Sequence, residues 1–324
     1  MTRYGVLLPT FDPLRAGGDW PVAQAARTAE GLGFDAVWAG DHLACPAPGL
    51  DAPSCLAAAA AVTERVSLGF SVMLLALRPP AWAAKQLTTI DALSGGRLVL
   101  GVGVGGEFPD EFQAAGVPLG ERGRRVDETL SVLPSLLTGR PVKHDGRVLS
   151  LDVPALEPAM ARPPPIFVGG RSQRAMRRAV RFGDAWLPMW LEPDTVAQQA
   201  GVLAELAAEQ GRPAPSIALL LGVRVDEDLE RARGEAAAHL QGQYGLPLHV
   251  VERWTALGSV ERVAEHVEAH RAAGVSEFLF MALGSDPIGQ YERLADVRAL
   301  VSADPGAVPA DHGGPLPADQ GARA

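Results

Sequence analysis

A glycine-rich stretch about a third of the way along the chain restricts the fold most strongly. Residues 94–107 read Ser-Gly-Gly-Arg-Leu-Val-Leu-Gly-Val-Gly-Val-Gly-Gly-Glu, a turn followed by a strand. Side chains alternate across a strand, so Gly101, Gly103 and Gly105 share one face while branched residues share the other. Interior glycine weakens a strand by about 0.5–1 kcal/mol per position, and it often marks the close approach of a ligand or another backbone. We interpret the glycine face as the floor of a site for a flat ligand.

The same letters match the dinucleotide-binding pattern G-x-G-x-x-G, which offers an alternative. That pattern requires the first strand of a nucleotide-binding unit, an immediate helix and a ribose-binding acid about twenty residues later. Here the strand is the fourth apolar run, Phe108-Pro109 follows it, and Asp127 falls inside a stretch with helical periodicity. The surrounding sequence therefore does not favour a dinucleotide-binding turn.

Strand-like and helix-like segments alternate along the chain. Short apolar runs predict eight strands, most of them followed by a segment with helical periodicity. Besides the glycine-rich strand, these runs are 4–8, 34–38, 66–75, 166–168, 185–187, 217–225 and 277–281. Eight such units suit a (β/α)₈ TIM barrel, which typically takes about 250 residues plus insertions. A doubly wound open sheet is the less favoured alternative.

Two insertions and a tail interrupt this alternation. Residues 140–165, after the fourth strand, are rich in proline, glycine and charge, with a hairpin expected at 142–149. Residues 244–258, before the eighth strand, form a second irregular stretch. Residues 302–324 lack periodicity and predict a disordered tail. We therefore expect one barrel domain over residues 1–301, followed by that tail.

The net charge restricts the expected binding partners, and the number of cysteines indicates the cellular compartment. A net charge of −9 argues against nucleic acid or an anionic membrane as the main partner. Cys45 and Cys55 are too few for a disulfide framework, so we expect a reducing cytoplasm. No apolar segment reaches the length of a membrane span. The histidines show no metal-ligand spacing on a common face, so we expect no metal site.

Active sites of barrels lie at the carboxyl ends of the strands, which restricts where the chemistry is expected. Asp41-His42 follows the second strand, and Glu107 follows the glycine-rich strand. A histidine can hold or pass the proton that accompanies hydride transfer. The alternatives are a turn with a capping aspartate for the pair, and a solvated loop acid for Glu107. Candidate pocket walls, for which core packing is the alternative, are Trp190, Tyr244, Trp254 and Met281.

A second candidate site follows the fifth strand, where Gly169-Gly170-Arg171-Ser172 leads into a helix. Backbone N–H groups freed by glycine, a helix N-terminus and an arginine together suit a phosphate. The alternative is an ordinary strand-to-helix turn capped by Ser172. Phosphates in barrels bind more often after the seventh and eighth strands, so this location needs further support.

That support comes from four motifs whose order resembles the luciferase-like family of flavin- and coenzyme F-420-dependent oxidoreductases. They are Gly-Phe-Asp-Ala-Val-Trp at 33–38 leading to Asp41-His42, Leu-Gly-Phe-Ser-Val at 68–72, Asp-Ala-Leu-Ser-Gly-Gly-Arg-Leu at 91–98 with the glycine-rich strand, and Pro-Ile-Phe-Val-Gly-Gly-Arg-Ser at 165–172. The resemblance covers residues 1 to about 300. It implies a (β/α)₈ barrel with FMN or coenzyme F-420 in its mouth, and a homodimer.

The resemblance also assigns roles to particular residues. In similar enzymes that use the deazaflavin, residues matching His42 and Asp41 line the ring, and an acid matching Glu107 can donate a proton. Ser71-Val72 matches a non-prolyl cis peptide that supports the ring. The cofactor-binding residues expected on this basis are Ser71, Val72, Gly103, Gly105, Gly106, Gly169, Gly170, Arg171 and Ser172. The family often carries an aromatic residue near Gly106, which this sequence lacks.

We therefore predict an oxidoreductase that transfers hydride between coenzyme F-420 and a small organic substrate. The Asp-His pair, Glu107 and the arginines that follow position 170 favour F-420. One alternative is an FMNH₂- and O₂-dependent monooxygenase of a small organic substrate, served by a separate flavin reductase. A catalytically silent flavin-binding barrel is another. A hydrolase is disfavoured because the sequence shows no nucleophile or metal cluster for it.

Overall fold

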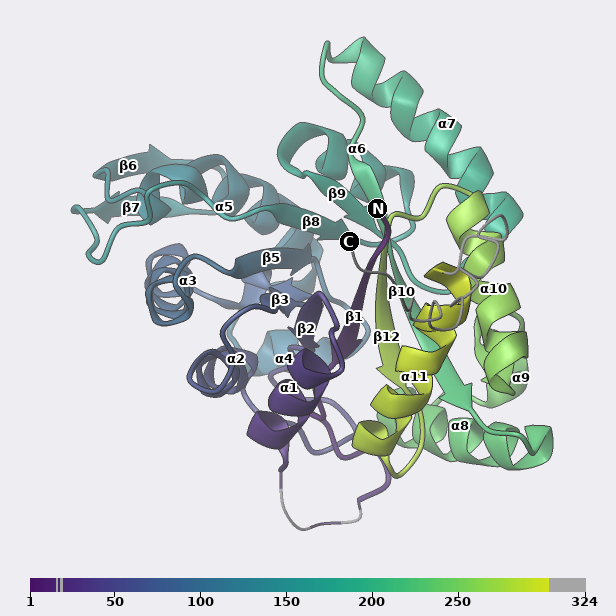
Figure 1. Cartoon of the computed structure of the whole chain (residues 1–324). Helices are drawn as coiled ribbons and strands as arrows, with labels where there is room; N and C mark the ends of the chain where they lie inside the picture. Colours follow the sequence, from purple (N-terminus) through teal and green to yellow (C-terminus); the bar gives the residue numbers. More distant parts are fainter. Residues whose placement is uncertain (16, 18–19, 303–324) are drawn as a thin grey trace, which may run out of the picture.

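The computed structural model describes residues 1–302 except 16, 18 and 19, and its strands close into a barrel (Figure 1). The eight barrel strands, all parallel, are β1 (Arg3–Leu7), β2 (Ala36–Ala39), β3 (Ser67–Phe70), β5 (Leu98–Gly103), β8 (Ile166–Gly169), β9 (Ala185–Leu187), β10 (Ser216–Val225) and β12 (Glu277–Ala282). The circle is closed where β1 pairs with β12 and β9 pairs with β10. The predicted (β/α)₈ barrel is confirmed.

Helices surround the barrel, and their ends follow expected capping chemistry. They are α1 (Val22–Gly31), α2 (Ala52–Ala60), α3 (Pro80–Ser94), α5 (Arg122–Leu137), α6 (Gln173–Phe182), α7 (Pro193–Glu209), α8 (Leu229–Tyr244), α10 (Val260–Ala272) and α11 (Pro287–Ser302). The Asp51 side chain accepts from the Ser54 N–H at 3.0 Å to begin α2, and Ser172 accepts from the Ala175 N–H at 3.2 Å to begin α6. The helix α3 ends at Gly95 with φ +66°.

Apolar side chains pack on both faces of the parallel barrel strands. The largest cluster lies between strands and helices, and a smaller one fills the barrel interior. A third cluster, which includes Trp190 and Met281, involves α8, α9 and β11. Inside, the Trp38 and Phe167 rings lie 5.6 Å apart between centroids. A Cβ atom at Gly69 would lie 2.1 Å from the Trp38 side chain, and one at Gly5 would lie 2.5 Å from it. These two glycines therefore make room for the largest interior side chain.

The first insertion contains the predicted hairpin, formed by the antiparallel strands β6 (Val142–Asp145) and β7 (Ser150–Val153). Its second strand begins later than the sequence pattern indicates. The Glu128 carboxylate, which comes from α5, accepts from the N–H groups of Arg147 and Leu149, both at 3.0 Å. Those donors are therefore not available for strand pairing. A short helix that the sequence pattern did not predict, α4 (Pro109–Ala114), follows β5.

The second insertion is more regular than expected. The helix α8 continues to Tyr244 and ends at Gly245 with φ +65°, and α9 (Leu248–Val251) follows. The strand β11 (Ala256–Gly258) then pairs with the end of β10. The remaining short elements are β4 (Met73–Leu74) and the 3-10 turns η1 (Leu75–Leu77), η2 (Leu119–Glu121) and η3 (Glu252–Trp254).

The structure describes the C-terminal end of the chain as far as Ser302. Ser302 ends α11 rather than beginning a tail. The rest of the predicted disordered tail, 303–324, lies outside the described residues. Among the helices described, none combines the length and the apolar character needed to cross a membrane.

Candidate active site

A cavity of about 240 Å³ lies at the carboxyl end of the barrel strands. The predicted site residues that line it are Asp41, His42, Ser71, Val72, Gly103, Gly105, Glu107, Gly169, Gly170 and Arg171. Gly106 does not line it and packs on Arg122, while Ser172 caps α6. Within the part of the chain that the structure describes, no three His, Cys, Asp or Glu side chains gather to hold a metal.

Asp41 is buried, and both of its carboxylate oxygens accept hydrogen bonds. Arg78 Nη1 donates to Oδ2 at 2.6 Å and Arg78 Nη2 donates to Oδ1 at 2.8 Å. The Leu74 N–H donates to Oδ2 at 2.9 Å. A bidentate arginine pair of this kind is strong and directional. Asp41 therefore holds β4 and the turn after it at the edge of the cavity. The catalytic role expected for Asp41 stays a prediction.

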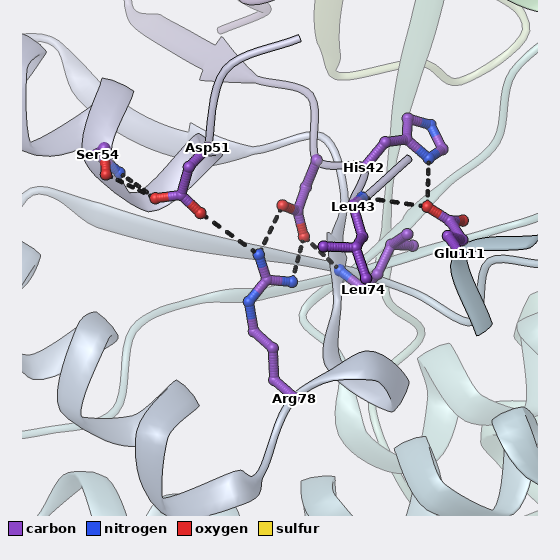
Figure 2. Close-up of polar contacts among 8 residues, drawn as sticks. His42, Leu43, Asp51, Ser54, Leu74, Arg78 and Glu111 are labelled. Atoms are coloured by element: carbon purple, nitrogen blue, oxygen red, sulfur yellow. Dashed lines mark hydrogen bonds and ion pairs between the residues drawn. The ribbon is translucent and has the colours of Figure 1, made fainter. Parts of the chain in front are cut away.

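His42 points the other way, toward a buried acid (Figure 2). Its Nδ1 lies 3.2 Å from Glu111 Oε2, which also accepts from the Leu43 N–H at 3.2 Å. Because a carboxylate only accepts, Nδ1 carries the ring hydrogen and Nε2 is the acceptor of the neutral ring. Glu111 is fully buried, and its Oε1 has no partner among the described residues. The rings of Phe11 and Phe108 lie 5.8 and 5.0 Å from the His42 ring.

Sequence reasoning missed Glu111 and Arg78. Glu111 lies on α4, which we did not expect after Phe108-Pro109. A signal was present, because proline suits the first turn of a helix and acidic residues suit its N-terminus, as in Pro109-Asp110-Glu111. No comparable signal links Arg78 to a carboxylate 37 positions earlier.

Other predicted residues form the rim and one wall. Glu107 is exposed at the rim. Burial raises the pKa of the Tyr244 hydroxyl and the Glu107 carboxylate raises it further, so the charge of Glu107 reaches this wall. Trp190 and Tyr244 meet edge to face at 5.6 Å, and Trp190 has φ +54°, which is uncommon for a bulky residue. Met281 lines a neighbouring cavity, and Trp254 lines neither.

The glycine face of β5 is covered by protein, which corrects our interpretation of it as the floor of a ligand site. A Cβ atom at Gly101 would lie 1.9 Å from the Phe70 carbonyl oxygen, and one at Gly103 would lie 2.3 Å from Val72 Cγ2. The segment between β3 and β4, which contains the expected cis Ser71–Val72 peptide, therefore packs into this space. The glycines admit another backbone, and the cavity lies beyond it.

Arg171 lines the cavity and pairs with no carboxylate of the described chain, although its Nη1 donates to the Trp190 carbonyl at 3.5 Å. Its guanidinium lies 5.8 and 5.9 Å from the ring centroids of Trp190 and Trp254. By contrast, Arg178, on the helix α6 that follows Arg171, donates to Asp127 at 2.6 Å. An arginine supported by aromatic faces keeps its charge available to an anion.

Comparisons with known proteins agree with this arrangement. Residues 3–277 match the family model described as luciferase-like monooxygenase. An uncharacterised Mycobacterium tuberculosis protein is 36% identical over 159 residues, which are 49% of this chain and 54% of that protein. The chain thus spans about half the length of that relative. An F-420-dependent glucose-6-phosphate dehydrogenase of Intrasporangium calvum is 32% identical over 297 residues, covering 86% of this chain and 80% of that enzyme.

A solved structure shows the same fold. The F-420-dependent secondary alcohol dehydrogenase in complex with an F-420–acetone adduct superposes with a TM-score of 0.80 and 21% identity, covering 93% of this chain and 99% of that one. At that identity the likeness concerns the fold alone. The family model extends over most of the chain and includes the strand ends that form the cavity. The chain belongs to the luciferase-like monooxygenase family.

Proposed function

We propose that this chain is an oxidoreductase that transfers hydride between coenzyme F-420 and a small organic substrate. The observation that carries the proposal is the bond between His42 Nδ1 and the buried Glu111. It leaves Nε2 as an acceptor in the same cavity as Arg171, which has no carboxylate partner among the described residues. The relative from Intrasporangium calvum, whose name includes F-420, supports this cofactor over FMN.

The residues present suit a flavin or deazaflavin. Arg171 lacks a carboxylate partner among the described residues, so its charge is available to a phosphate at the cavity. Val72, which packs over Gly103 and Gly169, offers an apolar surface to a ring. The Ser71 hydroxyl is buried without a partner in the described chain, so it can bind a polar edge of that ring.

His42 handles the proton in this proposal, while the bound cofactor supplies the acceptor or donor of the hydride. As hydride leaves the carbon of a substrate alcohol, the hydroxyl proton passes to His42 Nε2. The Nδ1–H keeps its hydrogen bond to Glu111, whose negative charge stabilises the imidazolium. In the reverse direction the same nitrogen returns the proton to the substrate oxygen. Glu107, at the rim, is the second proton donor that we propose.

A second candidate is an FMNH₂- and O₂-dependent monooxygenase of a small organic substrate. The description of the matching family favours it. A separate flavin reductase then supplies the reduced FMN. The same cavity serves both candidates, because FMN and F-420 each combine a planar ring with a phosphate.

Titration of the purified chain with FMN, FMNH₂, coenzyme F-420 and NADPH, followed by absorbance and fluorescence, tests the proposal. Tighter saturable binding of F-420 than of FMN supports hydride transfer. Tight FMNH₂ binding with substrate-dependent O₂ consumption replaces the proposal with the monooxygenase. Binding of a flavin or deazaflavin without turnover of any alcohol, ketone or aldehyde in a broad panel identifies a silent barrel.

We further propose that the chain forms a homodimer through α3. Trp82 and Leu93 on this helix are 68% and 59% exposed, and large exposed apolar side chains mark contact surfaces. Sedimentation is expected to show a dimer that Trp82→Glu converts to a monomer, while Leu300→Glu on α11 leaves it intact. A monomeric wild-type chain contradicts the proposal. The cytoplasmic location stays a prediction, based on the unpaired Cys45 and Cys55.

A further inference from the structure

A second cavity, of about 250 Å³, lies beside the first at the same end of the barrel. Leu7, Phe11 and Gln243 line both cavities, so the two cavities meet at these side chains. Phe11 is held in place there, because a Cβ atom at Gly40 or Gly49 would lie 2.5 or 2.6 Å from its ring. An engineered apolar cavity of about 150 Å³ binds benzene. The second cavity therefore has room for a substituted ring while a cofactor fills the first.

The lining of this second cavity is mostly apolar. Leu8, Leu14, Trp20 and Met281 are among its contributors. Asp12 is the only charged side chain among the described residues that line it, and neither a lysine nor an arginine is one of them. Without a cation in the wall, an anionic ligand entering this cavity loses its hydration and gains no compensating charge.

One arginine, Arg224, lies near the lining residue Gly284 but does not itself line the second cavity. Its Nη1 donates to the Leu283 carbonyl at 3.2 Å. Glu235 Oε2 and Arg224 Nη1 would lie 2.5 and 2.8 Å from a Cβ atom at Gly284. The negative charge of Glu235 and the positive charge of Arg224 therefore both lie close to Gly284, and their electrostatic potentials inside the cavity offset each other.

Polar groups of the lining form a series of hydrogen bonds that starts at a backbone N–H. Because a backbone N–H can only donate, it determines which atom of each later pair carries the hydrogen. The Gly284 N–H donates to His239 Nδ1 at 3.2 Å, so the hydrogen of the neutral ring is on Nε2. This Nε2–H donates to Gln243 Oε1 at 3.1 Å, and Gln243 Nε2 donates to the Tyr244 hydroxyl at 3.2 Å. Burial lowers the pKa of His239 to about 4, which keeps the ring neutral. The second hydrogen on Gln243 Nε2 is bonded to no other described residue and can bind an acceptor.

We infer that the second cavity binds the substrate, and that this substrate is an uncharged, largely apolar molecule with one acceptor oxygen. The inference rests on the proposed function, because it assigns the first cavity to the cofactor. Gln243 holds the substrate oxygen where the two cavities meet, on the side of the first cavity that His42 also lines. A phosphorylated sugar does not fit, since the described lining has no cation to bind its phosphate. The chain thus differs in substrate class from the relative named glucose-6-phosphate dehydrogenase.

Binding of four probes to the whole chain, measured by titration calorimetry and ligand-observed NMR without turnover, tests the inference. Acetophenone is neutral with one acceptor, ethylbenzene has none, and benzoate and glucose 6-phosphate are anions. We expect acetophenone to bind roughly three- to tenfold more tightly than ethylbenzene, as one hydrogen bond provides. We expect both anions to bind at least about tenfold more weakly than acetophenone.

Three variants locate the binding. Met281→Trp fills the cavity and is expected to weaken acetophenone binding at least about tenfold, whereas Leu300→Trp, exposed on α11, changes it less than about twofold. Because Met281→Trp can fail to fold, Gln243→Glu provides a second measurement. It retains an acceptor for His239 Nε2–H but removes the free N–H, so the advantage of acetophenone over ethylbenzene disappears.

Coenzyme F-420, added to the acetophenone complex, separates this inference from the proposed function. Both are expected to bind together, because the cavities are distinct. Displacement of acetophenone by F-420, equal or tighter binding of an anion, or unchanged binding in a folded Met281→Trp variant overturns the inference and leaves the proposed function standing. Acetophenone binding without binding of any flavin or deazaflavin overturns the proposed function, and the substrate role falls with it.

Discussion

The two ends of the barrel differ in how far their polar side chains are hydrogen-bonded to the protein itself. At the amino end, Asp35 accepts from the Tyr4 N–H and Asp184 accepts from the Ile166 N–H, both at 2.8 Å, so each carboxylate joins two neighbouring strands. There too, Arg97 donates to four main-chain carbonyl oxygens. Polar side chains at this end are bound to the protein itself, and their bonds stabilise the fold.

At the carboxyl end, two buried polar atoms have no partner among the described residues. They are the Ser71 hydroxyl and Glu111 Oε1. Arg171 reaches a main-chain carbonyl, that of Trp190 at 3.5 Å, but no carboxylate of the described residues. Trp190 adopts a positive φ. Buried polar groups without partners are rare in folded proteins, so the Ser71 hydroxyl, which lines the cavity, is a group that a ligand can satisfy. The amino end therefore contributes stability, and the carboxyl end is where we propose that the ligands bind.

Replacing His42 is expected to have the largest effect. His42→Ala removes the proton acceptor, so kcat falls roughly 10²- to 10⁴-fold, about 3–5 kcal/mol in the barrier. The free energy of unfolding changes by less than about 1 kcal/mol, measured by urea denaturation. His144→Ala, on the β6–β7 hairpin, is the control and retains turnover with F-420. Full turnover by His42→Ala removes the role that we propose for this residue.

Replacing Arg97 is expected to affect stability instead. Arg97→Ala leaves several carbonyl oxygens without their charged donor and lowers the free energy of unfolding by about 3 kcal/mol. Arg271→Ala, which breaks an exposed pair with Glu268, costs less than about 1 kcal/mol. Chemical denaturation measures both, and cofactor titration at low temperature should give unchanged affinity. If Arg97→Ala instead weakened cofactor binding and spared stability, the contrast between the two ends would be lost.

Replacing Arg171 distinguishes a phosphate site from an ordinary turn. Arg171→Gln is expected to weaken binding of FMN and F-420 roughly 10- to 100-fold, about 1.5–3 kcal/mol, because a charged hydrogen bond is lost. Riboflavin, which has no phosphate, should bind with less than about twofold change. Arg178→Gln is the matched control, since Arg178 is already paired with Asp127. Fluorescence titration gives the affinities, and an equal loss for riboflavin contradicts a phosphate contact.

Glu277 is the exception at the amino end and has the smallest expected effect. Burial raises its pKa from 4.5 to about 7, Arg3 opposes this and Asp35 adds to it. The folded state holds the proton more tightly, so this contribution to stability is complete below pH 4.5 and is lost as the pH rises to about 7. Glu277→Gln should therefore gain about 1–2 kcal/mol of stability relative to wild type between pH 5 and pH 8.

Unfolding at several pH values measures this gain. In Glu268, the hydrogen bond from Arg271 lowers the carboxyl pKa, so Glu268→Gln is expected to shift the pH dependence in the opposite direction. A pH-independent difference between Glu277→Gln and wild type contradicts the raised pKa.

Local sequence patterns predicted much of the fold because they reflect backbone geometry. The alternation of strands and helices predicted the closed barrel, and Asp51 and Ser172 cap the helices that they precede. The rule that barrel sites lie at strand ends predicted that His42 and Arg171 lie at the same end of the barrel, and both line one cavity there. These inferences need only the period of the backbone and the chemistry of neighbouring residues.

The partners of those residues depended on the tertiary structure. The His42–Glu111 bond joins positions 69 apart, and no periodicity carries information over that separation. Gly101 shows the same limit. Glycine in the strand predicted that another group approaches closely, but only the packed structure identifies this group as the Phe70 carbonyl rather than a ligand. Sequence by itself determined the barrel and the end that carries the chemistry. Packing decided which groups meet there, because contacts between distant segments depend on how whole elements fit together.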